Sequence, residues 1–454
     1  MNIFIHRRDI RWQDNTTLLK MDDVVPIFIF TPEQINPKKN KYFSNNLVEF
    51  MCKSLNELDN EYKKIRSDSG LTLFEGDIID VLNDIIKNNK IEKIGFNIDY
   101  SPYSKKRDNK ITKWATKNNI EVVTHEDMLL DNIIDTDPPN KQYKVFTPFY
   151  NNCIKKKVQN VIKRKPKLFG GKLKGISKYQ ITHNQIAKFY NDNPKRNVEP
   201  GRKEGIKKLL AIKKLNQYNK CRNFLDYKTS NLSAYINLGI LSIREVYHYA
   251  LQKLGKKNDF IKELYWRDFY YNILYFYPHV VGGPFYEKYS KLKWENNVSK
   301  FNKWCKGETG FPIVDACMKQ LNTTGYMHNR GRMIVASFLT KNLMVDWKWG
   351  ERYFATKLID YNISANNGGW QWASGTGTDA QPYFRIFNPW TQSKNYDDDA
   401  SFIKLWIPEL ESVPAKDIHN WHSKHIDYQD INYPKPIVIH EETREKALSM
   451  YKKV

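Results

Sequence analysis

Residues 24–30 read Val-Val-Pro-Ile-Phe-Ile-Phe, an uninterrupted apolar run of the kind that forms a strand buried on both faces. A shorter strand pattern precedes it at residues 2–6. Strand and helix patterns then alternate, with helices expected over 47–65, 77–89 and 105–118 and strands over 71–75, 94–98 and 120–124. Strands separated by helices predict a doubly wound parallel sheet with helices on both faces, so we expect residues 1–135 to form an α/β domain.

Beyond this domain the pattern changes twice. Residues 151–202 hold lysine runs among glycine and asparagine, and they predict a basic, partly irregular connection over 136–204. The simpler interpretation is a solvated linker, and the alternative is a direct nucleic-acid contact. After Gly205 the strand patterns stop, and helical periodicity predicts an all-helical domain over 205–454, with helices at 236–254, 260–277, 313–321, 332–347 and 351–359.

The net charge and the hydrophobic content limit the classes of protein to which this chain can belong. Among 454 residues, 73 Lys and Arg outnumber 50 Asp and Glu, which gives a net charge of +23. Such a surplus favours polyanionic partners such as nucleic acid, although a lysine-rich surface that merely keeps the protein soluble explains it equally well. The 41% hydrophobic content excludes a wholly disordered chain.

Cysteines and hydropathy suggest an intracellular, soluble protein. The 5 cysteines are scattered and none shows C-x-x-C spacing, so we expect no metal site and no disulfide framework. No apolar run approaches the roughly 20 residues that a membrane helix needs, and residues 1–8 do not form a signal peptide. We therefore expect a reduced compartment and no membrane partner.

Four polar segments in the second half could carry chemistry, and each also has a purely structural interpretation. The segment 326–333 could be a helix start with a solvated face, and 360–372 a tight turn held by core tryptophans. The segment 229–233 suits either a phosphate or simple helix capping. In 263–268, Glu263 and Arg267 have the spacing of an ordinary helix ion pair.

Taken together, these segments resemble the photolyase/cryptochrome family, and they are most similar to class I cyclobutane pyrimidine dimer photolyases. The resemblance begins at residues 7–15, continues at 144–149 (Lys-Val-Phe-Thr-Pro-Phe) and is densest over 263–406, where it includes 376–389. It covers nearly the whole chain. It implies an α/β antenna-type domain followed by an all-helical FAD-binding domain, as the two sequence patterns also require.

The resemblance implies a non-covalent FAD that is active in its reduced form. A buried pair of Arg332 and Asp360 would lie beside the flavin ring, with Asn366 facing its N5 atom. Family members usually carry Asp where this chain has Asn362, which changes one contact to the cofactor's ribose or phosphate side. The residues that the resemblance assigns to the cofactor are Tyr218, Arg222, Thr229, Ser230, Leu232, Ser233, Arg267, Arg332, Asp360, Asn362 and Asn366.

The implied activity is light-driven repair of ultraviolet-damaged DNA by a monomer. Reduced FAD would donate an electron to a flipped-out cyclobutane dimer and split it into monomers. Trp266 and Trp372 would sandwich the dimer, Glu263 would hydrogen-bond its bases, and Asn329 and Met333 would line the same pocket. Contacts to the DNA backbone are assigned to Arg330 and Gln392.

Three tryptophans match the electron-transfer chain of the family, namely Trp370, Trp347 and Trp294. Any one of them alone is more simply explained as a core residue. Their coincidence at matching positions favours a relay that reduces the flavin in light.

Several alternatives stay open. A (6-4) photolyase needs a histidine pair in the pocket, where this chain has Asn329 and Met333 with only His328 nearby. A cryptochrome-like photoreceptor is the main rival, although the chain stops at Val454 without the long tail common in cryptochromes. A basic nucleic-acid-binding scaffold without chemistry is the third interpretation.

A second, antenna chromophore is expected at the carboxyl edge of the N-terminal sheet. Its identity is open, because residues 97–103 depart from the folate-binding pattern, which has Glu where Ser101 stands. A deazaflavin, another flavin, a folate bound differently, or no antenna are the alternatives.

Overall fold

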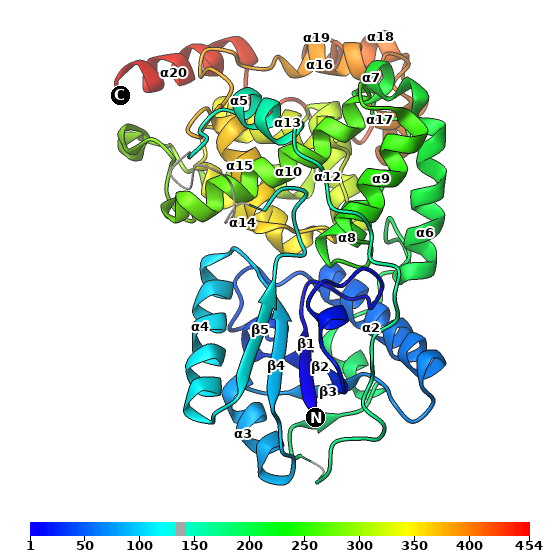
Figure 1. Ribbon diagram of the computed structural model, residues 1–454. Coiled ribbons are helices and arrows are strands. Elements are labelled where there is room, and N and C mark those ends of the chain that lie inside the picture. The colour runs from blue at the N-terminus through cyan, green and yellow to red at the C-terminus, as the bar shows by residue number, and fades with distance from the viewer. Residues whose placement is uncertain (133–141, 176) are drawn as a thin grey trace.

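The computed structural model describes residues 1–132, 142–175 and 177–454, and it consists of an α/β half and a helical half (Figure 1). Within this described part, the strands form one sheet in the order β5-β4-β1-β2-β3-β6. Strands β1 to β5 run parallel, and β6 pairs antiparallel with β3 at one edge. The strands are β1 (Asn2–His6), β2 (Val24–Phe30), β3 (Thr72–Glu75), β4 (Lys93–Asn97), β5 (Glu121–His125) and β6 (Gln180–Ile181). The prediction of a doubly wound parallel sheet is confirmed.

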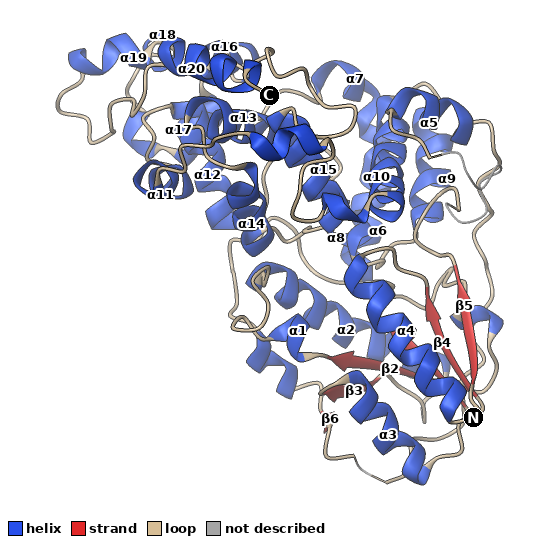
Figure 2. Ribbon diagram, turned by 90° about the vertical axis from the view of Figure 1, so that its left-hand side faces the viewer, coloured by secondary structure: helices blue, strands red, loops and turns tan. Residues whose placement is uncertain are grey.

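Helices cover both faces of this sheet, which explains the unbroken apolar run in β2. Ile5 and Ile27 pack with α3 (Ile78–Asn88) and α4 (Pro102–Lys117) on one face. Phe4 and Phe28 point the other way and pack with α2 (Asn45–Ile65). Figure 2 shows these helices flanking the strands. Side chains alternate between the faces of a strand, so a strand covered on both sides favours apolar residues at successive positions.

The second half is helical, as predicted. Helix α5, in the stretch predicted as a connection, packs on α10 in this half (Figures 1 and 2). The predicted boundary between residues 135 and 136 lies outside the described residues. The remaining helices are α1 (Pro32–Ile35), α5 (Phe146–Cys153), α6 (Arg202–Ala211), α7 (Tyr218–Cys221), α8 (Ser233–Asn237), α9 (Ile243–Leu254), α10 (Asp259–Phe276), α11 (Val298–Lys306), α12 (Pro312–Thr324), α13 (Asn329–Ser337), α14 (Trp347–Lys357), α15 (Ile363–Ser374), α16 (Pro389–Tyr396), α17 (Ser401–Trp406), α18 (Ala415–Ile418), α19 (Trp421–Lys424) and α20 (His440–Lys452).

The helix predicted over 236–254 is wrong as a single element, because the chain breaks between α8 and α9. Gly239 there has a φ of 60°, and a Cβ at this position would lie 2.3 Å from the carbonyl oxygen of Arg8. Glycine therefore lets the helical half approach the chain that follows β1. Across this close contact, Arg11 donates a hydrogen bond from Nη1 to the Gly239 carbonyl at 2.9 Å.

The helix predicted over 332–347 is also divided. Helix α13 ends at Ser337 and passes into one π-helical turn (Phe338–Asn342). Met344 then has a φ of 50°, which ends the helical course before α14 begins at Trp347. The apolar periodicity continues through this break because the turn is buried as well, so periodicity alone could not reveal it.

No helix of the described residues has both the length and the apolarity needed to cross a bilayer. In the same part of the chain, no group of three or more His, Cys, Asp or Glu side chains is arranged to hold a metal ion. The cysteines are all free thiols.

A buried ion cluster joins the two halves. Arg244 of α9 donates from Nε to Asp14 Oδ2 at 2.9 Å and from Nη2 to Asp127 Oδ1 at 2.8 Å. Asp127 also accepts from Arg11 and from the Thr16 amide. Burial alone would lower the pKa of Arg244, but the carboxylates of Asp127 and Asp14 raise it, so the guanidinium is held in its charged form.

Replacing Arg244 by methionine is therefore expected to destabilise the protein by about 3–5 kcal/mol, because the buried Asp14 loses its charged partner and Asp127 is left with Arg11 alone. Chemical unfolding followed by tryptophan fluorescence measures this change. The matched control is Arg66→Met, since Arg66 is exposed and pairs with the exposed Asp68, and it should change stability by less than about 1 kcal/mol. Equal losses in the two variants would show that the cluster does not hold the halves together.

Candidate active site

A cavity of about 470 Å³ opens in the helical half. Helices α10, α13 and α15 supply most of its wall, each through residues three or four positions apart that share one helix face. The predicted site residues on this wall are Arg222, Glu263, Trp266, Arg267, Asn329, Arg330, Arg332, Met333, Asp360, Asn362, Asn366, Trp370 and Trp372. The structure thus brings together residues that the sequence separates by more than a hundred positions.

Eight other predicted residues lie outside the wall: Tyr218, Thr229, Ser230, Leu232, Ser233, Trp294, Trp347 and Gln392. The segment with Thr229 is nevertheless close, because Thr229 interacts with Tyr326, whose ring lies 5.5 Å from the guanidinium of Arg332. Leu232 is fully buried and packs in the core. The predicted roles of these residues remain predictions.

Positive charge dominates the wall, with four arginines against two carboxylates. Arg332 donates from Nη2 to both oxygens of Asp360, at 3.1 and 2.9 Å, and from Nε to the Met327 carbonyl. Burial lowers the pKa of Arg332, and the Asp360 carboxylate more than restores it. The Nε atoms of Arg267 and Arg330 are buried without a hydrogen-bond partner. Such a wall suits an anionic ligand that supplies acceptors for these donors.

Glu263 pairs with Arg222 across the cavity and not with Arg267. The helix ion pair that its spacing allowed is absent because Arg267 donates instead to the Met128 carbonyl at 2.7 Å and to Asp268 at 2.9 Å. Burial raises the pKa of Glu263, and Arg222 opposes that rise. A carboxyl group in this state can accept or donate a hydrogen bond to a ligand in the cavity.

Asn362 caps α15 and uses every polar atom of its side chain. Its Oδ1 accepts from the amides of Ser364 and Ala365, both at 3.1 Å. Its Nδ2 donates to the Tyr271 hydroxyl at 2.7 Å and to Asn237 Oδ1 at 3.1 Å. An ionised aspartate here could not donate to Asn237 Oδ1, so this hydrogen bond requires the amide of Asn362.

Asn366, one turn after the cap, donates from Nδ2 to the Glu351 carbonyl at 3.0 Å. This bond ties the amide to α14 and fixes its orientation at the cavity wall.

Aromatic rings form the apolar part of the site. Trp370 packs edge-on against Phe354 at 5.0 Å and Trp304 at 6.0 Å. Gly350 of α14 makes this packing possible, because a Cβ there would lie 2.1 Å from the Trp370 ring. Trp347 is buried at the start of the same helix α14.

The sequence interpretation missed seven wall residues: Asn223, Tyr270, Ala336, Phe354, Leu358, Ala365 and Gly369. Tyr270 and Ala336 lie four residues after Trp266 and Arg332, and helical spacing could have found them. At Gly369 no atom beyond its chain neighbours lies within 4 Å of where a Cβ would be, so this position leaves open space at the wall.

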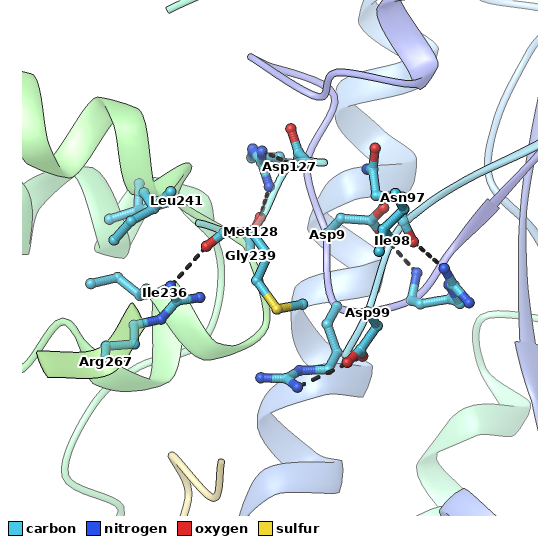
Figure 3. Close-up of a pocket in the computed structure, with 14 residues that line it drawn as sticks. Asp9, Asn97, Ile98, Asp99, Asp127, Met128, Ile236, Gly239, Leu241 and Arg267 are labelled. Carbon is cyan, nitrogen blue, oxygen red and sulfur yellow. Dashed lines mark hydrogen bonds and ion pairs between the residues drawn. The ribbon is translucent and has the colours of Figure 1, made fainter. Parts of the chain in front are cut away.

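A second, much smaller pocket lies at the carboxyl edge of the sheet, where an antenna chromophore was expected. Its volume is about 20 Å³, enough for one water molecule and too small for an aromatic chromophore. Figure 3 shows Arg267 reaching Met128 and Asp99 facing an arginine across this pocket. That arginine is Arg8, 3.7 Å from Asp99. Arg267 lines both cavities.

The chain matches two protein-family models. Residues 2–167 match the model described as DNA photolyase, and residues 260–453 match the FAD binding domain of DNA photolyase. Relatives named deoxyribodipyrimidine photo-lyase include one from Buchnera aphidicola, 37% identical over 99% of this chain and 96% of its own. Another from Escherichia coli is 32% identical, covering 98% of this chain and 97% of its own.

Solved structures of a photolyase and of a cryptochrome resemble this chain over its whole length. A photolyase from Sulfolobus tokodaii, described with two FAD molecules, superposes with a TM-score of 0.87 at 38% identity and covers 100% of both chains. A cryptochrome from Synechocystis superposes with a TM-score of 0.87 at 25% identity and covers 99% of both chains.

His328 provides a pH test of the site's framework. Its Nδ1 accepts from the Arg330 amide at the start of α13, and burial lowers its pKa to about 4. The unfolded chain protonates this histidine below about pH 6.5, so folding stability is retained above that pH and lost as the pH falls to about 4, by about 3 kcal/mol. His328→Asn keeps a capping acceptor without a titrating group. Unfolding midpoints measured from pH 7 to 4 should fall more steeply in the wild type than in His328→Asn. Parallel profiles would show that His328 does not cause the loss of stability.

Proposed function

This chain belongs to the DNA photolyase family, and we propose that it repairs DNA by splitting cyclobutane pyrimidine dimers in a light-driven reaction. The deoxyribodipyrimidine photo-lyases that resemble it over almost their whole length support this function. The observation that carries it is a single cavity that combines an arginine-rich wall with Glu263, Trp266 and Trp372.

The cofactor is FAD, and the cavity fits it. The partnerless Nε atom of Arg267 and the paired Arg332 offer donors and positive charge to an anionic group, while Gly369 leaves open space at the wall for a flat ring. When bound, reduced FAD supplies the electron that light drives to the dimer and that returns after the ring has split. We assign Arg332, Asp360 and Asn366 to holding the flavin, with the segment 229–233 on its phosphate side.

The remaining wall residues are assigned to the damaged bases. Trp266 and Trp372 offer aromatic surface on which unstacked bases can lie. Glu263 offers a hydrogen bond to their polar edge, and Arg222 holds its carboxyl group in place. The weakened pairing of a dimer lowers the cost of flipping it out of the duplex. The phosphates of the strand meet a basic protein, with Arg330 and Gln392 as their assigned contacts.

The structure favours neither the (6-4) photolyase nor the photoreceptor alternative. His328 does not line the cavity and is buried as a cap of α13. Burial lowers its pKa to about 4, which favours the neutral form near pH 7, and its Nδ1 accepts from the Arg330 amide.

No step is assigned to a second chromophore. Arg8 and Asp99, which lie 3.7 Å apart, line the small pocket at the sheet edge.

One experiment tests the proposed function. The purified protein is examined for a flavin absorption spectrum and is then illuminated with blue light, a reductant and an oligonucleotide that contains one thymine dimer. Light-dependent recovery of thymine absorbance is expected. A flavin that photoreduces without restoring thymine would contradict the proposal and redirect attention to (6-4) substrates and then to signalling.

Glu263→Gln should lower the repair rate about 10- to 100-fold while FAD stays bound, because it removes a charged hydrogen-bonding group from the substrate side. The matched control is Asp259→Asn, one turn earlier on α10, which also faces Arg222 at 3.6 Å but does not line the cavity. Repair rates under limiting light and flavin absorbance measure both variants. Unchanged repair in Glu263→Gln would remove Glu263 from the substrate role.

Trp370→Phe should block photoreduction of the flavin but spare repair by chemically reduced enzyme, because the relay begins at the cavity wall. Trp304→Phe is the control, since Trp304 lies 6.0 Å from Trp370 but belongs to the core and not to the predicted relay. Flavin absorbance under blue light follows photoreduction. Normal photoreduction in Trp370→Phe would place the relay elsewhere, and loss of photoreduction in Trp304→Phe would route it through Trp304.

A further inference from the structure

We infer that Phe146 is a positioning residue that fixes the plane of the Trp266 indole for the damaged base. The inference rests on the proposed function, in which Trp266 stacks on the dimer. The two rings are parallel within 4°, and their centroids are 3.7 Å apart. Phe146 thus stacks on one face of the indole, while Phe269 and Tyr270 meet it at larger angles, so a ligand in the cavity that Trp266 lines can stack only on the opposite face.

Phe146 can hold this plane because it is itself fixed on several sides. Its side chain is buried, and it meets Phe269 edge-on at 5.7 Å. Tyr150, one turn along α5, stacks on it at 5.6 Å with an angle of 20°. Rotation of the indole away from Phe146 would open a void against a rigid group of rings, which is costly in a packed interior. A dimer base on the open face of Trp266 would extend this aromatic series by one ring.

The backbone of Phe146 is anchored by the loop that follows α15. The Phe146 amide donates to Asp379 Oδ2 at 3.0 Å, and Thr378 donates from its hydroxyl to the Lys144 carbonyl. Asp379 has a φ of 46°, a conformation uncommon for a residue other than glycine. Helix α15 carries Trp372, the other proposed stacking wall. The same loop therefore links the two walls, and it gives the sequence motif 144–149 a role.

The test compares Phe146→Leu with the matched control Phe149→Leu. Phe149 lies in the same helix, is equally buried and touches Phe269, but it has no ring contact with Trp266. Binding of a thymine-dimer oligonucleotide and of its undamaged counterpart is measured in the dark on the flavin-loaded proteins, so that the readout does not depend on repair. Flavin absorbance and the unfolding midpoint confirm that each variant is folded.

Phe146→Leu is expected to weaken dimer binding about 5- to 10-fold with little change for undamaged DNA, and Phe149→Leu to leave the ratio of the two affinities unchanged. Asp379→Gly tolerates the positive φ and removes the side chain with its carboxylate, and a smaller loss of about 3-fold is expected. In a Trp266→Ala background, Phe146→Leu should have no further effect, because it acts through the indole.

Two results would overturn the inference, and they are distinguishable. If Trp266→Ala weakens dimer binding but Phe146→Leu stays within twofold of the wild type, Phe146 has no positioning role and the proposed function stands. If Trp266→Ala itself binds the dimer normally, the stacking role of Trp266 fails and the inference falls with it.

Discussion

The ion cluster of Arg244 with Asp14 and Asp127 is the constraint on which the arrangement of this protein depends. The two carboxylates follow β1 and β5, and the guanidinium comes from α9 in the other half. Charges buried this deeply are tolerated only when each has its partner. A slipped docking of the two halves would leave a buried charge unpaired, so the cluster selects one relative placement and disfavours its neighbours.

That placement also sets the orientation of α10. Arg267 donates to the Met128 carbonyl, and Asp268 accepts from the Leu130 amide at 2.7 Å. Both partners lie in the segment just after β5, close to Asp127 in the chain. Arg267 lies one turn after Glu263 and next to Trp266, so bonds that hold Arg267 and Asp268 fix the rotation of α10 and keep Glu263 and Trp266 at the cavity wall. The interface between the halves therefore positions the site, and Arg267 belongs to both.

The sheet and the charged and aromatic residues of the cavity wall could be predicted from the sequence. Strands buried on both faces are mostly apolar, and the arginines, Glu263 and the tryptophans carry functional groups that can be matched to a known chemistry. Ala336, Ala365 and Gly369 were missed because small residues in a helix serve many purposes. The break at Gly239 depends on the distant Arg8 carbonyl, and β6 consists of only two residues, so neither leaves a periodic signal.

Asn362 links the sheet edge to the cavity through hydrogen-bond acceptors that it shares with Arg8. Arg8 Nη2 donates to the same two atoms as Asn362 does, the Tyr271 hydroxyl at 2.7 Å and Asn237 Oδ1 at 2.6 Å. The carboxylate that pairs with Arg8 is Asp99, at 3.7 Å on the sheet side. An aspartate at position 362 would place a second negative charge near Arg8, on the cavity side. The neutral amide keeps the network of hydrogen bonds without that charge, so more of the positive potential of the wall remains for an anionic cofactor.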